Sequence, residues 1–83
     1  MNPEERFSNM GFAQAGPDVW FREFIHPETE SRLEVTARLY PAGKVGVLIK
    51  RDGRVRRVKE YTRSVGLAAN AVRMAVERAG FQI

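Results

Sequence analysis

The side chains with the clearest chemical potential are arginines and lysines in the second half of the chain. Seven of the fourteen residues from Lys50 to Arg63 are basic. Arginine outnumbers lysine eleven to three over the whole sequence. The planar guanidinium group binds phosphate and carboxylate through two hydrogen bonds at once, whereas the lysine ammonium acts as a point charge. The pattern indicates a negatively charged partner, and a genome rich in arginine codons is the alternative explanation of the arginine excess.

A second set of residues that could do chemistry surrounds the only histidine. His26 stands near Glu28 and Glu30, and such a set could hold a metal ion or act as a base. No second histidine completes the site, and the absence of cysteine excludes thiolate ligands and disulfides. Glycine-rich phosphate loops are also absent. We therefore expect no enzymatic activity, no metal and no cofactor, and a reducing cytoplasm as the setting.

The composition predicts one small globular domain spanning residues 1–83, with a thin core and an apolar fraction of 43%. The net charge of +4 is unevenly placed. Residues 1–49 carry five basic and seven acidic side chains, whereas residues 50–83 carry nine and three. No apolar run approaches the ~20 residues that cross a bilayer, so we expect no membrane partner. The first ten residues lack the apolar stretch of a signal peptide.

Residue spacing predicts the elements that position these side chains. Asn2 as a cap and Pro3 at the first position indicate a short helix that stops by Gly11. Residues 12–17 are expected to form a loop, and residues 18–25 a strand with apolar groups on both faces.

Two alternating segments follow, Arg32 to Tyr40 and Lys44 to Lys50, and Arg54 to Glu60 completes the set of strands. Residues 41–43 and the Asp52-Gly53 pair are the predicted turns. The fold class is thus predicted to be α+β, with a four-stranded antiparallel meander, a C-terminal helix on one face and a short N-terminal helix.

The two turns also predict the register of the strands. A three-residue loop pairs Leu39 with Val45 and Val35 with Ile49. A two-residue loop pairs Arg51 with Arg54, and continuing that ladder pairs Val47 with Val58. Because this places apolar residues opposite one another, turn chemistry and apolar pattern agree on one core face.

The last helix is predicted to start at a cap, Thr62 or Ser64, and to run to about Ala79. Its valines and alanines recur at helical spacing, so this stripe would pack closely on the sheet. Gly80 is suited to end the helix in a left-handed conformation, which would fold Phe81 back onto it.

The predicted register places a basic surface on the sheet face away from the helix. Its expected partner is nucleic acid or another acidic surface such as that of a ribonucleoprotein, with Tyr40 stacking on a base and Gly46 forming a shallow floor between Arg38 and Lys59. A solvated face that resists aggregation is the alternative. The candidate binding residues, including the hairpin tip, are Arg38, Tyr40, Lys44, Lys50, Arg51, Arg54, Arg57 and Lys59.

The aromatic strand leaves a second surface open. Trp20 and Phe24 share one face, and Phe21 lies on the other. One set must cover the core, and the other is exposed unless Phe7 and Met10 of the N-terminal helix cover it. An exposed set, with Trp20 and Phe24 as the candidates, would mark a protein interface or a homodimer.

The segment from Arg32 to Ala79, with its basic hairpin and alanine-rich helix, is similar to the double-stranded-RNA-binding domain. The resemblance implies that fold and contact with an RNA backbone. That family presents a lysine cluster at the start of its last helix, where this chain has Tyr61-Thr62-Arg63-Ser64. The similarity is therefore one of shape.

In size, architecture and lack of cysteine, the chain also resembles small phage and mobile-element accessory proteins of the anti-CRISPR kind. This resemblance implies an inhibitor that binds a host ribonucleoprotein. A basic member would dock on acidic protein surface or on guide or target nucleic acid, because a chain of charge +4 cannot imitate nucleic acid. Direct nucleic-acid binding and protein-directed inhibition are the two functional hypotheses.

Overall fold

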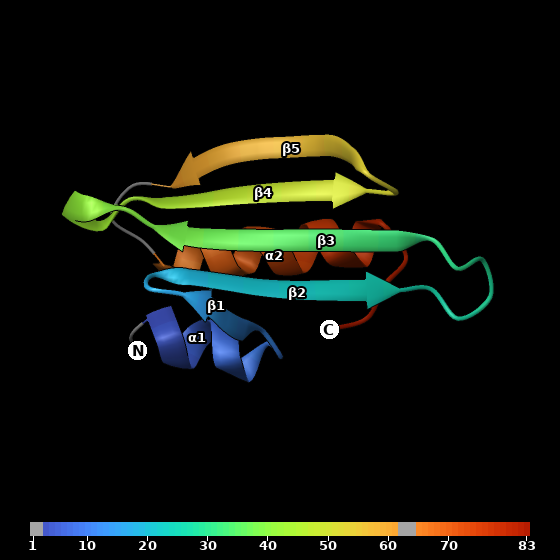
Figure 1. Ribbon diagram of the computed structural model, residues 1–83, viewed down its shortest axis with the longest axis horizontal. Coiled ribbons are helices and arrows are strands. Elements are labelled where there is room, and N and C mark those ends of the chain that lie inside the picture. Colours follow the sequence, from blue (N-terminus) through green and yellow to red (C-terminus); the bar gives the residue numbers. More distant parts are fainter. Residues whose placement is uncertain (1–2, 62–64) are drawn as a thin grey trace.

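The computed structural model describes residues 3–61 and 65–83. Figure 1 shows its helices and strands in the order in which they follow one another along the chain. The elements are α1 (Pro3–Asn9), β1 (Ala13–Gly16), β2 (Val19–Ile25), β3 (Arg32–Leu39), the 3₁₀ turn η1 (Pro41–Gly43), β4 (Val45–Arg51), β5 (Arg54–Tyr61) and α2 (Val65–Arg78).

The strands form one antiparallel sheet in the order β1-β2-β3-β4-β5. The predicted α+β class, meander order and two helices are confirmed, but the sheet has five strands rather than four. The additional strand, β1, lies in the segment predicted to be a loop. Its sequence Ala-Gln-Ala-Gly is short and largely exposed, so it lacks the alternation by which a half-buried strand is recognised.

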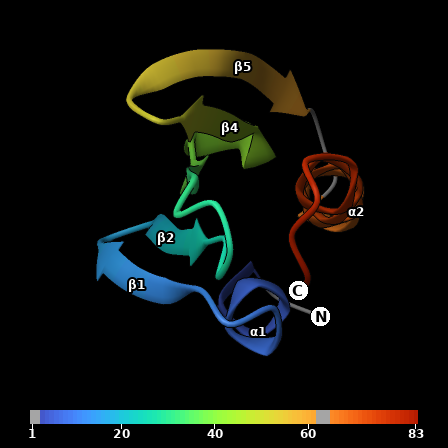
Figure 2. The ribbon, with the colours of Figure 1, turned by 90° about the vertical axis from the view of Figure 1, so that its right-hand side faces the viewer.

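Both helices lie on the same side of the sheet, and the opposite face, here called the outer face, is uncovered (Figure 2). Alternate residues of the central strands meet α2 in the core, as the predicted alanine-rich stripe requires. Ala68 and Val72 of α2 are fully buried, as are Val35 and Ala37 of β3. Small side chains on the helix thus allow its backbone to approach the sheet closely.

The end of α2 follows the predicted pattern. Gly80 has a φ of 90°, and its N–H donates to the carbonyl of Glu77. The N–H of Phe81 donates to the carbonyl of Val76, which completes a Schellman motif, and the Phe81 ring is buried. The predicted N-caps of the two helices, Asn2 and either Thr62 or Ser64, lie outside the described residues.

The β3–β4 hairpin has the predicted register. Leu39 pairs with Val45, and Val35 pairs with Ile49. Gly43 has a φ of 79°, the left-handed conformation expected for it. Leu33, Val35, Val45 and Ile49 are all buried on the helix side.

The β4–β5 hairpin corrects the predicted register. Arg51 pairs with Arg54 as expected, but Lys50 pairs with Val55 and Ile49 pairs with Arg57. Arg56 is therefore an extra residue, a β-bulge, and Val58 pairs with Leu48 rather than with Val47. Beyond the bulge every side chain of β5 points to the face opposite the predicted one.

The structure also decides which aromatic residues of β2 are buried and which are exposed. Trp20 and Phe24 are 3% and 5% exposed, so the prediction that they form a protein interface is wrong. Helix α1 covers Trp20, whose ring stacks on Phe7 with centroids 5.6 Å apart. Phe21 is the partly exposed member, on the outer face. The face with Trp20 and Phe24 packs on the core because its two large rings bury more apolar area than Phe21 alone would.

Candidate functional site

The bulge at Arg56 moves the basic side chains of β5 from the outer face to the helix side of the sheet. Arg57 pairs with Ile49 and Lys59 pairs with Val47, and both partners are buried core residues that face α2. The prediction that these two cations share the outer face with Arg38 is therefore wrong. Arg57 and Lys59 instead extend past the core at the edge of the sheet, where both are exposed.

A groove runs between β5 and α2, and we call it the β5–α2 groove. It consists of two adjoining hollows of about 380 and 320 Å³, which share Arg57, Ala75 and Arg78. Basic side chains from three elements line it, with four guanidinium groups and one ammonium group among them. These are Arg51 of β4, Arg56, Arg57 and Lys59 of β5, and Arg78 of α2.

The floor of the β5–α2 groove is apolar. Leu67 and Met74 of α2 are 62% and 45% exposed there, and Tyr61 of β5 lies beside them, half-buried. The Nζ of Lys59 lies 5.4 Å from the centre of the Tyr61 ring, a cation–π distance. The groove therefore combines positive walls with an apolar floor that includes an aromatic ring.

Within residues 3–61 and 65–83, no acidic side chain lines either hollow of the groove. The ion pairs found in this part of the chain lie elsewhere, Arg32 with Glu23 at 3.5 Å and Lys44 with Glu60 at 3.9 Å. Clustered positive charge with no internal counter-ion raises the local potential and attracts anions. A polyanion is the ligand that suits such a surface.

The tip of the β4–β5 hairpin is fixed to the neighbouring β2–β3 loop. Asp52 and Gly53 have φ values of 51° and 83°, as a type I′ turn requires. Asp52 accepts hydrogen bonds from the Arg32 N–H at 2.8 Å and from the Ser31 hydroxyl at 3.0 Å. These bonds, the backbone one first, lower the pKa of Asp52 below its usual range. The tip that carries Arg51 and Arg54 is thus held by side-chain anchors.

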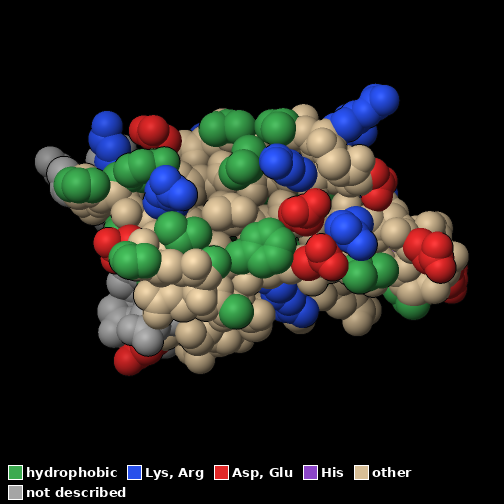
Figure 3. Space-filling view, viewed as in Figure 1, with side chains coloured by type: hydrophobic (Ala, Val, Ile, Leu, Met, Phe, Trp, Pro, Cys, Tyr) green, Lys and Arg blue, Asp and Glu red, His purple; other side chains and the backbone are tan. Residues whose placement is uncertain are grey.

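The outer face carries charges of both signs rather than a basic patch (Figure 3). Of the sequence-predicted binding residues, Arg38 and Lys50 occupy this face together with Tyr40, and Lys44 reaches it through its ion pair with Glu60. Three acidic side chains lie among them: Glu23, Glu34 and Glu60. The structure therefore separates the predicted site, because Arg51, Arg54, Arg57 and Lys59 lie on the helix side.

Tyr40 and Gly46 do not form the predicted shallow floor between two cations. A Cβ on Gly46 would lie 2.8 Å from the Tyr40 ring, so the ring rests directly over this glycine. Glu60, not Lys59, is the residue paired with Gly46 on the far side. Glycine is needed here because any side chain would displace the tyrosine.

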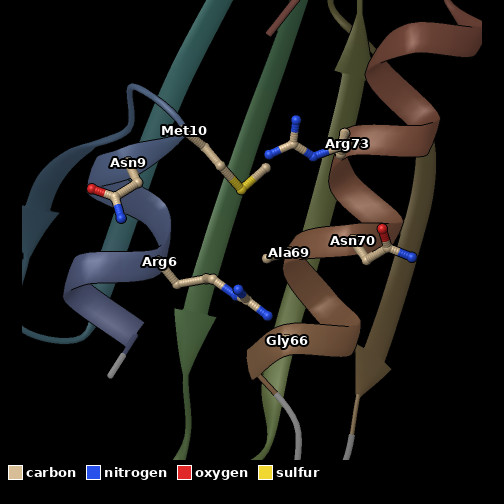
Figure 4. Close-up of a pocket in the computed structure, with 7 residues that line it drawn as sticks. All are labelled: Arg6, Asn9, Met10, Gly66, Ala69, Asn70 and Arg73. Atoms are coloured by element: carbon tan, nitrogen blue, oxygen red, sulfur yellow. The ribbon is translucent and has the colours of Figure 1, made fainter. Parts of the chain in front are cut away.

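A second basic hollow, of about 300 Å³, lies between α1 and α2. Arg6 and Arg73 point into it from the two helices, and Met10 lies beside them (Figure 4). The sequence offered no signal for Arg6, and the spacing of Arg73 and Glu77 indicated only an ordinary i,i+4 helix pair. This hollow offers two cations where the β5–α2 groove offers five, so the groove is the stronger candidate.

His26 has a structural role. Its Nδ1 accepts hydrogen bonds from the N–H groups of Glu28 and Thr29 at 3.3 and 3.4 Å, and its ring edge meets Phe81 with centroids 5.9 Å apart. In the described part of the chain, no group of three or more histidine or acidic side chains is placed to hold a metal ion.

Among the basic and aromatic residues of the β5–α2 groove, three were not predicted as site residues: Arg56, Tyr61 and Arg78. Arg78 had a usable signal, because it follows Ala75 by three positions and so flanks the buried stripe of α2. The predicted register already placed Arg56 on the helix side, opposite Ile49, but at the sheet's outer edge rather than in a site. Only Tyr61 reaches the helix side because of the bulge, and no glycine stands at the bulge itself to mark it.

No protein-family model, curated protein or solved structure matches this chain. Among the helices of residues 3–61 and 65–83, none has the length and apolar character to cross a membrane.

Proposed function

We propose that this protein binds nucleic acid through the β5–α2 groove. The observation that carries the proposal is the convergence of five basic side chains on one groove that no acidic side chain of the described residues lines. Phosphates would contact the arginines of the walls, where guanidinium groups offer paired donors. This binding needs no catalytic group.

The floor of the groove favours a single strand over a duplex. A duplex keeps its bases stacked inside and would present phosphates, sugars and base edges, but no base faces, to Tyr61 and Met74. A single strand can turn its bases onto an apolar and aromatic surface, and each stacked base contributes about 1–3 kcal/mol. Sequence preference is expected to be weak, because stacking accepts every base and phosphate contacts carry no sequence information.

The test is fluorescence anisotropy with a labelled single-stranded oligonucleotide and its duplex, measured over a series of salt concentrations. The Arg57→Gln/Lys59→Gln variant should bind the single strand much more weakly. Its slope of log affinity against log salt should be shallower by about 0.7 for each phosphate that the variant no longer neutralises. The matched control is Arg38→Gln/Lys50→Gln, which removes the same charge from the outer face and should bind nearly as the parent does.

Two outcomes would contradict the proposal. One is equal loss of affinity in the two double variants, which would assign binding to net charge rather than to the groove. The other is the absence of salt-dependent binding to either oligonucleotide. That result would favour the protein-directed inhibition implied by the resemblance to phage accessory proteins.

A further inference from the structure

The outer face, which lies outside the proposed nucleic-acid site, carries an uncharged row of residues across the sheet. Strand pairing aligns one residue from each strand into a row that crosses all five strands, and no member of this row is charged. The row consists of Ala13, Phe21, Thr36, Leu48 and Val58. Val58 is 72% exposed and Val55 next to the row is 57% exposed, so apolar surface is open to solvent here (Figure 3).

Charged residues flank this uncharged row in a pattern of opposite signs. On the central strand, Glu34 and Arg38 lie two residues to either side of Thr36, about 7 Å from it along the strand. On β4, Lys50 is paired with Glu34 and so lies on the same side of the row as Glu34. Gly46 is paired with Arg38 and lies on the other side, next to Glu60 of β5. Glu34 and Arg38 therefore lie at mirrored positions across the row, as do Lys50 and the Gly46–Glu60 pair. Glu23 of β2 also lies on the Glu34 side, but it is already paired with Arg32 at 3.5 Å.

We propose that two copies of the chain pair through their outer faces, about a two-fold axis that runs along the uncharged row. This axis places Arg38 of each copy opposite Glu34 of the other. It also places Lys50 over the Gly46 position of the other copy, next to Glu60. Both contacts occur twice, as a two-fold interface requires.

The charges select this axis over the other one that would also bring the two faces together. A two-fold axis parallel to the strands would place Arg38 against Arg38 and Glu34 against Glu34, and like charges at close range oppose association. The selected axis aligns the strands of the two sheets antiparallel, as in an aligned β-sandwich. The α2 helices and the β5–α2 grooves remain on the outside of the pair.

The expected dimer is weak and reversible. Five strands spaced ~4.8 Å apart and about five residues of ~3.3 Å each cover roughly 400 Å² per copy. The two copies together would bury roughly 800 Å², which is below the ~1,200 Å² at which specific, stable interfaces start and within the range of weak, transient contacts. Association should therefore be visible only at high protein concentration, and the proposal stands independently of nucleic-acid binding.

Sedimentation equilibrium over a wide concentration series tests the proposal with charge reversals. Arg38→Glu and Glu34→Arg should each be monomeric, because each places two like charges opposite one another. An equimolar mixture of the two variants should regain the parent's association, since unlike charges then face each other at both contacts. The double variant Arg38→Glu/Glu34→Arg should also dimerise.

The Arg57→Gln/Lys59→Gln variant is the matched control, because it changes charge on the helix side and should associate at least as well as the parent. A parent that stays monomeric throughout the series would overturn the proposal. So would single reversals that associate like the parent, or a mixture and a double variant that both remain monomeric.

Discussion

Two hairpins that share strand β4 differ in how far their sequence specifies them. In both, the predicted turn forms and the first pair beyond it is correct, Leu39 with Val45 in one and Arg51 with Arg54 in the other. The β3–β4 ladder then continues in register to its end. The β4–β5 ladder shifts by one residue at Arg56.

Burial explains the difference. Strands β3 and β4 alternate between buried and partly exposed positions, so a shift of one residue would turn their valines and leucines into water. Strand β5 is exposed at every position except Tyr61. A turn sets the first pair of a hairpin, but only a buried face maintains the register further along.

The bulge places a more suitable residue against the core at the far end of β5. In the predicted register Glu60 would lie opposite buried Val45, whereas in the structure Tyr61 occupies that position and packs against the core. Glu60 moves to the outer face, where it pairs with Lys44 at 3.9 Å. The exchange places an amphipathic ring rather than a carboxylate at the edge of the core.

The largest contrast is expected from single-residue deletions in the two strands. Deletion of Leu48 from β4 should abolish cooperative folding, because it turns the buried residues on one side of the gap to the wrong face. Deletion of Arg56 should leave a regular hairpin with the same pairs on both sides and a melting temperature close to the parent's. Thermal unfolding followed by circular dichroism measures both, and the interpretation of Arg56 as the bulge fails if its deletion also unfolds the protein.

A smaller contrast is expected from two valines that the sequence alone predicts to be partners. Val47→Ala should cost about 1.5–3 kcal/mol of unfolding free energy, because Val47 is buried against α2. Val58→Ala should change it by less than about 0.5 kcal/mol, because Val58 is 72% exposed. Urea unfolding gives both values. If the two variants lose a similar free energy of unfolding, Val58 would be buried opposite Val47, as the sequence predicts.

The sequence was sufficient where apolar spacing and turn residues acted together. The β3–β4 register, the alanine stripe of α2 and the Gly80–Phe81 ending all follow from local chemistry and one buried face. Strand β1 was missed because its residues bury little surface.

For the candidate site, the sequence predicted the type of side chain but not the face of the sheet, because the residues of β5 bury little surface. The type of side chain was evident, and so was the partner that such charge suggests. The face depended on Arg56, an exposed arginine among other exposed arginines, where neither burial nor a glycine indicates a bulge.

The smallest effect concerns the turn that both registers share. The pKa of Asp52 is lowered in the folded protein, so its carboxylate favours folding at a pH above its usual value of 3.8, and this contribution is lost as the pH falls through the lowered value. Asp52→Asn keeps a residue suited to the turn and removes the charge. The variant should be less stable than the parent at neutral pH, and the difference should narrow below pH 3.8. A difference that is independent of pH would mean that the hydrogen bonds to Ser31 and Arg32 do not depend on the charge.

The central claim is that nucleic acid binds on the helix side, in the β5–α2 groove, and not on the outer face. Methyl resonances report on the two sides separately, because Leu67 and Met74 line the groove and Leu48 lies on the outer face. Titration of a methyl-labelled sample with a single-stranded oligonucleotide should shift the Leu67 and Met74 signals progressively and leave that of Leu48 nearly unchanged. Shifts at Leu48 with none at Leu67 and Met74 would contradict the account and return the binding site to the outer face.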